Sequence, residues 1–437
     1  MADPAGLLTK PAAAVGAVYA ASGFALASWA SRLPAVQAGG RLSADDLGLL
    51  LLWLSMGMVL SLMLAGEAVY HLGTTRAMRV GTAVCAGGLT VVATHPAGAL
   101  LPWAAACIGA GNGLCDVAMN VRGAAVGRAG YRSARGAGRR LMPRLHGAWS
   151  LGTVVGAVAG AVAAAIGVPV RAHLPIVAGI LFGVVFLATR DLAHGDDALD
   201  VREGRLARRW SGAWREWFSR RTFALGLLAL GAAFAEGTAN EWLTVGLVNG
   251  YALGHAGAAA GLGLFMIAMT AVRFGVGVFR NVSSERWLVG SVALVLAGTA
   301  TLVLGESLDA LRGLQLVTAV VGITLWGAGA ALGVPWAMAA AADDASAAAA
   351  RTSVVATISY ASFLAGPPGL GFLAERLGYV VPLGLAGVVM FAAFGSAAVL
   401  HPQHLRVRRE AVTLPRDPAK VPQAETGSPG PLSQAST

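Results

Sequence analysis

Charged residues are scarce in this chain of 437 amino acids. Asp, Glu, Lys and Arg together make up 12% of the sequence, whereas soluble proteins average about 25%. The phosphate-binding pattern Gly-x-x-x-x-Gly-Lys-Ser/Thr, the zinc pattern His-Glu-x-x-His and the hydrolase pattern Gly-x-Ser-x-Gly are all absent. These absences predict no enzyme activity, no metal, no cofactor and no direct use of ATP.

Cysteine is also rare. Cys85, Cys107 and Cys115 are the three in the sequence, and all of them fall in apolar stretches. An odd number of cysteines in such surroundings favours packing residues over a disulfide framework or a metal site.

Long apolar stretches are what the sequence has instead. Twelve segments can each form a helix of about 20 residues, the length that crosses roughly 30 Å of hydrocarbon. The predicted spans are 12–32, 47–69, 77–95, 99–122, 143–167, 171–189, 222–249, 256–279, 287–304, 313–340, 353–374 and 380–400. The sequence therefore predicts an all-α membrane protein with twelve transmembrane helices.

Basic residues are distributed unequally between the two sides of these spans. With a cytoplasmic N-terminus, 26 of the 32 Lys and Arg residues fall in inward-facing regions, five fall outside, and one, Arg273, lies within a span. The positive-inside rule then predicts a multi-pass protein with both termini in the cytoplasm. The net charge of +10 comes from Arg in short loops that can meet anionic lipid head groups. We therefore expect membrane lipids as partners and no nucleic acid.

A polar interruption divides the spans into two groups of six. Residues 190–221 contain eight Arg and six acids, and we interpret them as a cytoplasmic linker. The two groups predict two pseudo-symmetric six-helix bundles, 12–189 and 222–400. Residues 1–11 are expected to form a cytoplasmic N-terminal segment, and the polar residues 401–437 a disordered cytoplasmic tail.

A faint repeat supports the two halves. Aligning Trp149 in the fifth span with Tyr360 in the eleventh also aligns Gly160 with Gly371. Equivalent positions in parallel repeats would produce this match. The alternative is chance, because glycine and aromatic residues are frequent in all membrane helices.

The fourth span carries a polar stripe. Asn112, Asp116 and Asn120 are four residues apart, so one face of a helix presents all three side chains. Ionisable groups are costly in hydrocarbon, so the stripe should face a water-filled cavity or another helix. Burial of Asp116 would favour proton uptake, which makes it a candidate proton carrier. The alternative is a static brace in which Arg122 or His146 neutralises Asp116.

The seventh span contains two acids within six residues. Glu236 and Asn240 share a helix face, whereas Glu241 is rotated from Glu236 by about 140° at 3.6 residues per turn. We expect Glu236 and Asn240 to face a cavity. Glu241 is expected to pair with a basic residue, and the candidates are Arg273 in the eighth span and Arg32 at the outer end of the first.

Aromatic residues in the spans are candidates for stacking on a solute. An apolar pocket with a few convergent polar groups is the usual small-molecule site. The candidates are Trp29, Trp149, Trp326, Trp336 and Tyr360. Each Trp could equally be an interfacial anchor, since Trp is frequent at the boundary between membrane and water.

Motifs in four spans resemble the major facilitator superfamily of secondary transporters, and the resemblance covers residues 12 to 400. The motifs are Asp116-x-x-Met119-Asn120, His146-Gly-x-x-Ser150-Leu-Gly152, Glu236-Gly-x-x-x-Glu241-Trp242 and Tyr360-x-x-Phe363-Leu364-x-Gly366-Pro367-Pro368. They are similar to a mostly uncharacterised bacterial inner-membrane branch related to the fucose permeases. The resemblance implies two bundles that rock about a central site lined by the first, fourth, seventh and tenth spans.

Two departures from the family pattern bear on the mechanism. The loop after the second span keeps the signature glycines Gly66 and Gly73, but Tyr70 stands where the family has an acid. Fucose permeases are sugar–proton symporters with acids in the first and fourth helices. Asp116 matches the fourth-helix acid, whereas the first span has no acid and only Arg32 at its end.

We predict a monomeric secondary transporter of the bacterial cytoplasmic (inner) membrane that moves a small organic solute by alternating access, coupled to protons. The predicted site comprises Asp116 and Glu236 for proton coupling; Asn112, Asn120, Asn240, Trp149, Trp326 and Tyr360 for solute binding; and Arg32, Arg122, His146, Glu241 and Arg273 for charge pairs or gating. One alternative is proton-driven efflux of a drug-like compound, because Gly147, Gly156 and Gly160 have antiporter-like spacing. The other is a non-transporting membrane sensor or scaffold.

Overall fold

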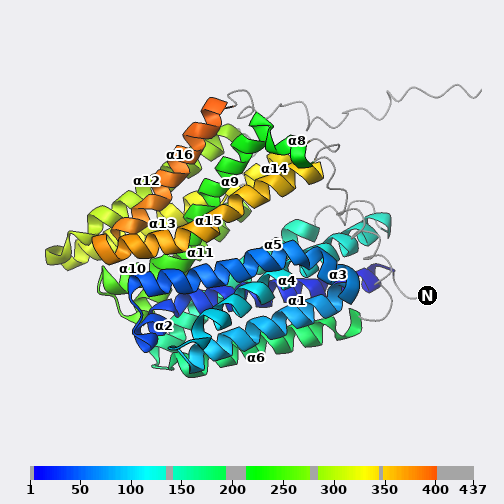
Figure 1. The fold of residues 1–437 in the computed structure, drawn as a ribbon, viewed down its shortest axis with the longest axis horizontal. Helices are drawn as coiled ribbons and strands as arrows, with labels where there is room; N and C mark the ends of the chain where they lie inside the picture. Colours follow the sequence, from blue (N-terminus) through cyan, green and yellow to red (C-terminus); the bar gives the residue numbers. More distant parts are fainter. Residues whose placement is uncertain (1–3, 134–140, 193–212, 276–283, 344–347, 401–437) are drawn as a thin grey trace, which may run out of the picture.

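The computed structural model describes residues 4–133, 141–192, 213–275, 284–343 and 348–400, and Figure 1 shows two helical bundles that lie side by side. The first bundle comprises α1 (Pro4–Ser31), α2 (Leu33–Gly40), α3 (Ala44–Thr94), α4 (Leu100–Ser133), α5 (Leu141–Ala165) and α6 (Val170–Thr189), followed by η2 (Arg190–Leu192). The predicted tail, 401–437, lies outside the described residues. So does most of the predicted linker, of which α8 (Ala213–Trp217) is described.

The second bundle begins with a helix in three parts. These are α9 (Arg220–Thr238), η4 (Ala239–Leu243), which is a π-helix, and α10 (Thr244–Asn249). The bundle continues with α11 (His255–Gly275), α12 (Ser284–Glu306), η5 (Asp309–Leu311), α13 (Arg312–Ala330), α14 (Gly333–Ala341), α15 (Ala348–Leu377), η6 (Val381–Leu383) and α16 (Gly384–Leu400).

Each predicted span is mainly helical over its described residues. Ten helical segments among the described residues are long and apolar enough to cross a membrane. One of them, α3, has 51 residues and contains both the second and the third predicted span. The eleventh predicted span lies within α15, which has 30 residues. The predicted all-α membrane fold is therefore confirmed.

Gly73 separates the two spans within α3. Its φ of 75° and ψ of 158° interrupt the helix in a conformation that residues with a side chain rarely adopt. The same glycine belongs to the loop signature of the resembled family. The resemblance and the backbone therefore agree on where the chain turns.

The two bundles repeat the same helix contacts. In the first, α1 packs on α5 and α6; in the second, α9 packs on α15 and α16. Likewise α3 packs on α4 and α6, as α12 packs on α13 and α16. Corresponding helices thus have corresponding neighbours, as expected for the pseudo-symmetry that the alignment of Trp149 with Tyr360 predicts.

The contact between α1 and α5 is close because α5 presents glycines to it. A Cβ atom at Gly152 would lie 2.1 Å from the carbonyl oxygen of Ala20, and one at Gly156 would lie 2.2 Å from that of Phe24. No side chain fits there, so the two backbones touch directly. Packing therefore accounts for the glycine spacing of α5, and that spacing no longer argues for efflux.

Two helix pairs join the bundles, α3 with α15 and α5 with α11. In the first pair, Gly48 and Gly371 lie backbone against backbone. A Cβ atom at Gly48 would be 2.8 Å from the carbonyl oxygen of Pro367 and 3.2 Å from the Cα atom of Gly371. The helices can approach this closely because neither glycine carries a side chain.

Polar contacts also join the bundles, at the end where α2 and α10 lie. Gln37 donates to the hydroxyl of Tyr379 at 3.1 Å, and Asn249 donates to the Gln37 amide oxygen at 3.3 Å. The backbone N–H of Ala44 donates to Glu375 at 3.0 Å. In Figure 1 the ribbons of the two bundles converge at this α2–α10 end and diverge toward the end that holds the N-terminus. The charge pattern predicts that the α2–α10 end faces outward.

Candidate functional site

Asp116 lies in a hydrogen-bonded network between α4 and α1. Asn120 donates from Nδ2 to the Asp116 carboxylate at 3.2 Å and to the Asp116 carbonyl at 2.8 Å. The Tyr19 hydroxyl of α1 donates to the Asn120 amide oxygen at 2.7 Å. The i, i+4 spacing in α4 brings Asp116 and Asn120 together, as the sequence predicts, and Tyr19 completes a chain of three polar groups.

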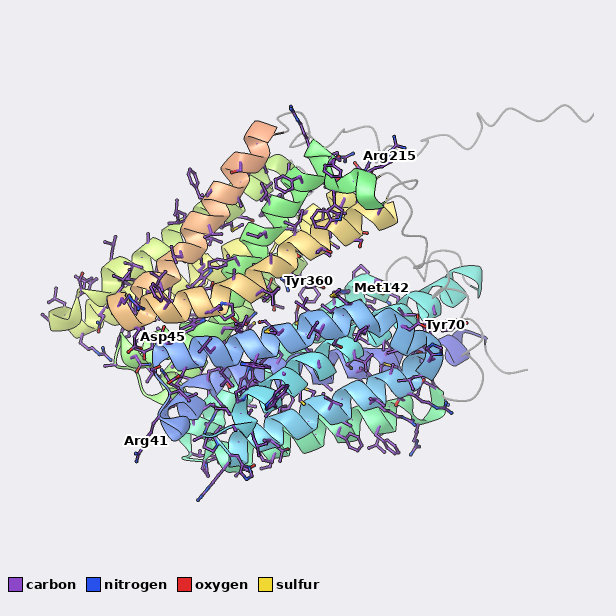
Figure 2. The ribbon with its side chains drawn as sticks, viewed as in Figure 1. Arg41, Asp45, Tyr70, Met142, Arg215 and Tyr360 are labelled. Carbon is purple, nitrogen blue, oxygen red and sulfur yellow. The ribbon has the colours of Figure 1, made fainter. Side chains whose placement is uncertain are left out.

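His146 and Tyr360 surround this network. The His146 ring of α5 lies 5.5 Å from the Tyr19 ring, centroid to centroid, and its charged form would stabilise the Asp116 carboxylate. Tyr360 of α15 is also within electrostatic range of Asp116. Figure 2 shows Tyr360 on the side of α15 that faces the first bundle. The Asp116 network therefore lies within electrostatic range of a residue of the second bundle.

Arg122 does not neutralise Asp116. Its side chain is 1% exposed and donates to the Leu192 carbonyl at 3.5 Å, and no ion pair within 4.0 Å joins it to Asp116. The Arg122 brace is therefore not formed. Of the two basic partners predicted for Asp116, His146 is the one that lies close enough to act on its carboxylate.

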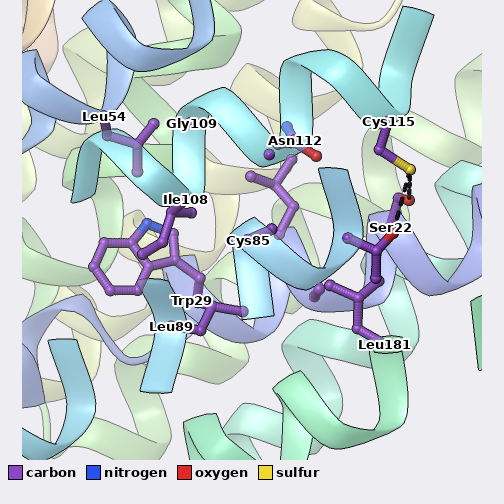
Figure 3. A pocket seen from close by; sticks show the side chains of 14 residues that line it. Ser22, Trp29, Leu54, Cys85, Leu89, Ile108, Gly109, Asn112, Cys115 and Leu181 are labelled. Carbon is purple, nitrogen blue, oxygen red and sulfur yellow. Dashed lines mark hydrogen bonds between the residues drawn. The ribbon is translucent and has the colours of Figure 1, made fainter. Parts of the chain in front are cut away.

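Asn112 faces a different space from Asp116. It lines a pocket in the first bundle, between α1, α3, α4 and α6 (Figure 3). Most of the lining is apolar, and it includes Trp29 and Cys115. The Cys115 sulfur lies 3.6 Å from the Thr82 hydroxyl and 3.9 Å from the Ser22 hydroxyl. Sequence reasoning missed these hydroxyls because a single Ser or Thr in an apolar helix gives no signal.

Glu236 forms an ion pair within the second bundle. Its carboxylate lies 3.0 Å from Arg273 Nη2, and the two side chains are 25% and 24% exposed. Arg273 Nε also donates to the Ala331 carbonyl at 3.0 Å, at the junction of α13 and α14. The basic partner expected for Glu241 thus binds Glu236, and the prediction that Glu241 forms this pair was wrong.

Glu236 and Glu241 lie in different kinds of helix, because Glu236 belongs to α9 and Glu241 to the π-helix η4. Residues 239–243 follow i→i+5 hydrogen bonding, so each turn holds an extra residue and the rotation from Glu236 to Glu241 differs from that of an α-helix. Among the described residues Glu241 has no hydrogen bond and no ion pair. The Asn240 amide oxygen beside it is buried without a partner.

The aromatic candidates differ in their placement. Trp149 is half-buried on α5, packed against the core of the bundle. Trp326 is 0% exposed and lies against Phe265 in an edge-to-face arrangement, with 5.6 Å between ring centroids. This burial places Trp326 in the core of the second bundle, so the expected stacking face is covered in this conformation. Tyr360 is the aromatic candidate that lies near Asp116.

Arg32 pairs with neither acid of the seventh span. It lies between α1 and α2, is 4% exposed, and donates from Nη2 to the Val168 carbonyl at 2.7 Å. The candidate pairing of Arg32 with Glu241 was therefore wrong, because the guanidinium turns toward the loop between α5 and α6.

Related proteins place this arrangement in context. No family model matches the sequence. The chain is 29% identical to the uncharacterised transporter y4wD of Sinorhizobium fredii, across 84% of this chain and 92% of the relative. It is 27% identical to an uncharacterised MFS-type transporter of Yersinia pestis, across 86% and 92%, and 25% identical to the membrane protein MosC of Rhizobium meliloti, across 84% of each.

Solved structures share the fold. The nucleoside transporter NupG superposes with a TM-score of 0.66 at 13% identity, across 88% of this chain and 98% of NupG. The fucose:proton symporter FucP of E. coli superposes with a TM-score of 0.61 at 15% identity, across 91% and 99%. Relatives that are named transporters argue against both an enzyme and a non-transporting sensor. The named relatives and the shared fold together show a multi-pass membrane transporter that is similar to MFS-type transporters.

Proposed function

We propose that this transporter is a proton-coupled symporter that moves a small organic solute across the bacterial cytoplasmic membrane by alternating access, with Asp116 as the residue that binds the proton. The observation that carries the proposal is the setting of Asp116. Its carboxylate is held by the neutral donor Asn120, with no ion pair within 4.0 Å among the described residues. Such a group can gain or lose a proton without leaving a buried counter-charge behind.

The solute would bind where the Asp116 network approaches the second bundle. Asn120 and Tyr19 supply an amide and a hydroxyl, and Tyr360 supplies an aromatic ring from α15. These groups suit a neutral solute that has hydroxyl groups and an apolar face. Glu236, held by Arg273, would act on the proton or the solute only when that ion pair opens.

Alternating access is supported by the contacts between the bundles. The polar contacts of Gln37, Asn249 and Glu375 lie at the α2–α10 end. The bundles diverge at the other end, which the charge pattern predicts to be cytoplasmic. We therefore infer that this conformation faces the cytoplasm. The monomeric state and the cytoplasmic location of both termini belong to the same proposal.

The solute class can be found by a thermal-shift screen of the purified protein. A compound that binds only the folded state raises the unfolding midpoint. Sugars and nucleosides come first in the screen, because the structural neighbours are a fucose:proton symporter and a nucleoside transporter. Organic acids and antibiotics follow, and binding of antibiotics alone would favour efflux.

Transport in proteoliposomes then tests the role of Asp116. With a solute from the screen, Asp116→Asn should lose accumulation driven by a pH gradient while it keeps solute exchange. The control is Glu67→Gln, which alters an exposed acid paired with His71 and should leave both activities unchanged. Normal accumulation by Asp116→Asn would remove Asp116 from proton coupling.

A further inference from the structure

Arg32 is a buried cation without a counter-charge. One of its nitrogen atoms, Nη2, donates to the Val168 carbonyl, while Nε and Nη1 are buried with no hydrogen-bond partner. Within the described residues, no carboxylate lies within 4.0 Å of the guanidinium. Because nearly all buried polar groups in folded proteins have partners, the free N–H groups of Arg32 need one.

The electrostatic cost of this arrangement is large. Burial removes water from the charged guanidinium of Arg32, but an arginine stays protonated at any physiological pH. The charge therefore cannot be removed by losing a proton. Water could accept the hydrogen bonds, but it would leave the charge uncompensated.

Helix ends surround Arg32. It directly follows the C-terminus of α1, whose dipole favours a cation, and it is the N-cap residue of α2, whose dipole disfavours one. The Val168 carbonyl, which accepts the hydrogen bond from Arg32, lies two residues before the start of α6. The N-cap residue of α6 is Pro169, whose side chain cannot accept a hydrogen bond. The charge of Arg32 also acts on His255, the first residue of α11 in the second bundle. Helix N-termini carry partial positive charge and bind anions in many proteins.

A second buried nitrogen atom without a hydrogen-bond partner lies within electrostatic range of Arg32. His173, in the first turn of α6, is 7% exposed, and its Nδ1 atom is buried without a hydrogen-bond partner. The charge of Arg32 acts electrostatically on the His173 ring. Two side chains, each more than nine-tenths buried, thus leave three nitrogen atoms free in one positive region.

We propose that Arg32 and His173 bind a small monovalent anion, with chloride as the test ion, at the α2–α10 end of the transporter. The anion would accept hydrogen bonds from the free guanidinium nitrogens and from His173, and it would neutralise the buried charge. Because His255 belongs to the second bundle, an anion here would also reduce the positive potential where the bundles meet. The site is separate from Asp116 and does not depend on any solute.

Thermal unfolding tests the site without a transport assay. The purified protein is unfolded in sodium chloride and in sodium gluconate at equal ionic strength, since gluconate is too large for a buried site. If chloride is at about ten times its dissociation constant, the unfolding midpoint should rise by about 1–3 °C. Arg32→Gln should abolish the difference. Arg41→Gln, which alters an exposed arginine at the other end of α2, should keep it.

Bromide provides a direct readout. Anomalous scattering from crystals grown in bromide should show a peak beside Arg32 and His173, and no peak in Arg32→Gln. If that variant does not fold, Arg32→Lys with His173→Ala should show a reduced midpoint shift and a weaker peak. An equal midpoint shift in the wild type and in Arg32→Gln would overturn the proposal, as would the absence of any chloride effect. Neither result would affect the role proposed for Asp116.

Discussion

The two bundles hold their membrane acids in different ways. In the first, Asp116 is bound by Asn120, which is in turn bound by Tyr19, and all three groups form hydrogen bonds whether or not Asp116 is charged. In the second, Glu236 is bound by Arg273, whose charge needs a carboxylate. The comparison indicates that the first bundle is suited to proton exchange and the second to a fixed pair of charges.

The largest effect on stability is expected from loss of the ion pair between Arg273 and Glu236. Arg273→Leu should destabilise the protein by about 3 kcal/mol, because Glu236 would become an unpaired charge and Ala331 would lose its donor. Loss of one partner of a buried ion pair costs about 3–5 kcal/mol. We expect the lower end of this range because both side chains are about one quarter exposed. Thermal unfolding in detergent measures it.

Glu241→Gln is the matched control for the ion pair. Glu241 lies in the same membrane segment but has no partner among the described residues, so its neutral isostere should change stability by less than about 0.5 kcal/mol. Asp116→Asn should be similarly mild. Equal losses of stability in Arg273→Leu and Asp116→Asn would contradict the inference that the second bundle holds its acid in a fixed ion pair and the first does not.

A smaller difference in stability is expected between alanine variants in two equivalent helix contacts, α1 with α5 and α9 with α15. Gly156→Ala in α5 should cost about 1–3 kcal/mol, because its Cβ atom would meet the Phe24 carbonyl and the backbone must move. Gly226→Ala in α9 should cost less than about 1 kcal/mol. Its Cβ atom would lie 2.4 Å from the Cδ1 atom of Ile358, which can rotate away, and alanine favours the helix. Equal unfolding midpoints for the two variants would show that the α1–α5 contact is not the tighter one.

Loss of the Tyr19 hydroxyl should have a smaller effect than loss of the Arg273–Glu236 ion pair. Tyr19→Phe keeps the ring beside His146 but removes the donor to Asn120, which should cost about 1 kcal/mol. In transport, the pH dependence of accumulation should shift, because the Asp116 network loses a member. Tyr70→Phe, at an exposed tyrosine, is the control and should match the wild type. A Tyr19→Phe variant with unchanged stability and pH profile would separate Tyr19 from the network.

Much of the fold follows from the sequence. Apolar length predicts the spans, and the loop-signature glycine, Gly73, marks the turn within α3. The pairing of Asp116 with Asn120 follows from their spacing on one helix. Tyr19 could not be predicted as a partner, because it is 101 residues away and reaches Asn120 only through helix packing.

The failures have physical causes. The choice of Glu241 as the charge partner assumed regular α-helical rotation, which the π-helix at residues 239–243 does not follow. Arg32 was a candidate partner for an acid of the seventh span, whereas the loop carbonyl of Val168 binds it instead. Trp326 was assigned to the solute because sequence gives no information about which face of a helix its bundle covers.

The crossing of α3 and α15 has a consequence for motion. Gly48 and Gly371 meet there without side chains, so no side-chain rotamers interlock at this point of the crossing. One bundle can then pivot on the other at this point while the contact distance stays the same. A bulky residue at either glycine would act as a wedge, and the molecule would be held at one tilt even if every group that binds proton or solute were intact.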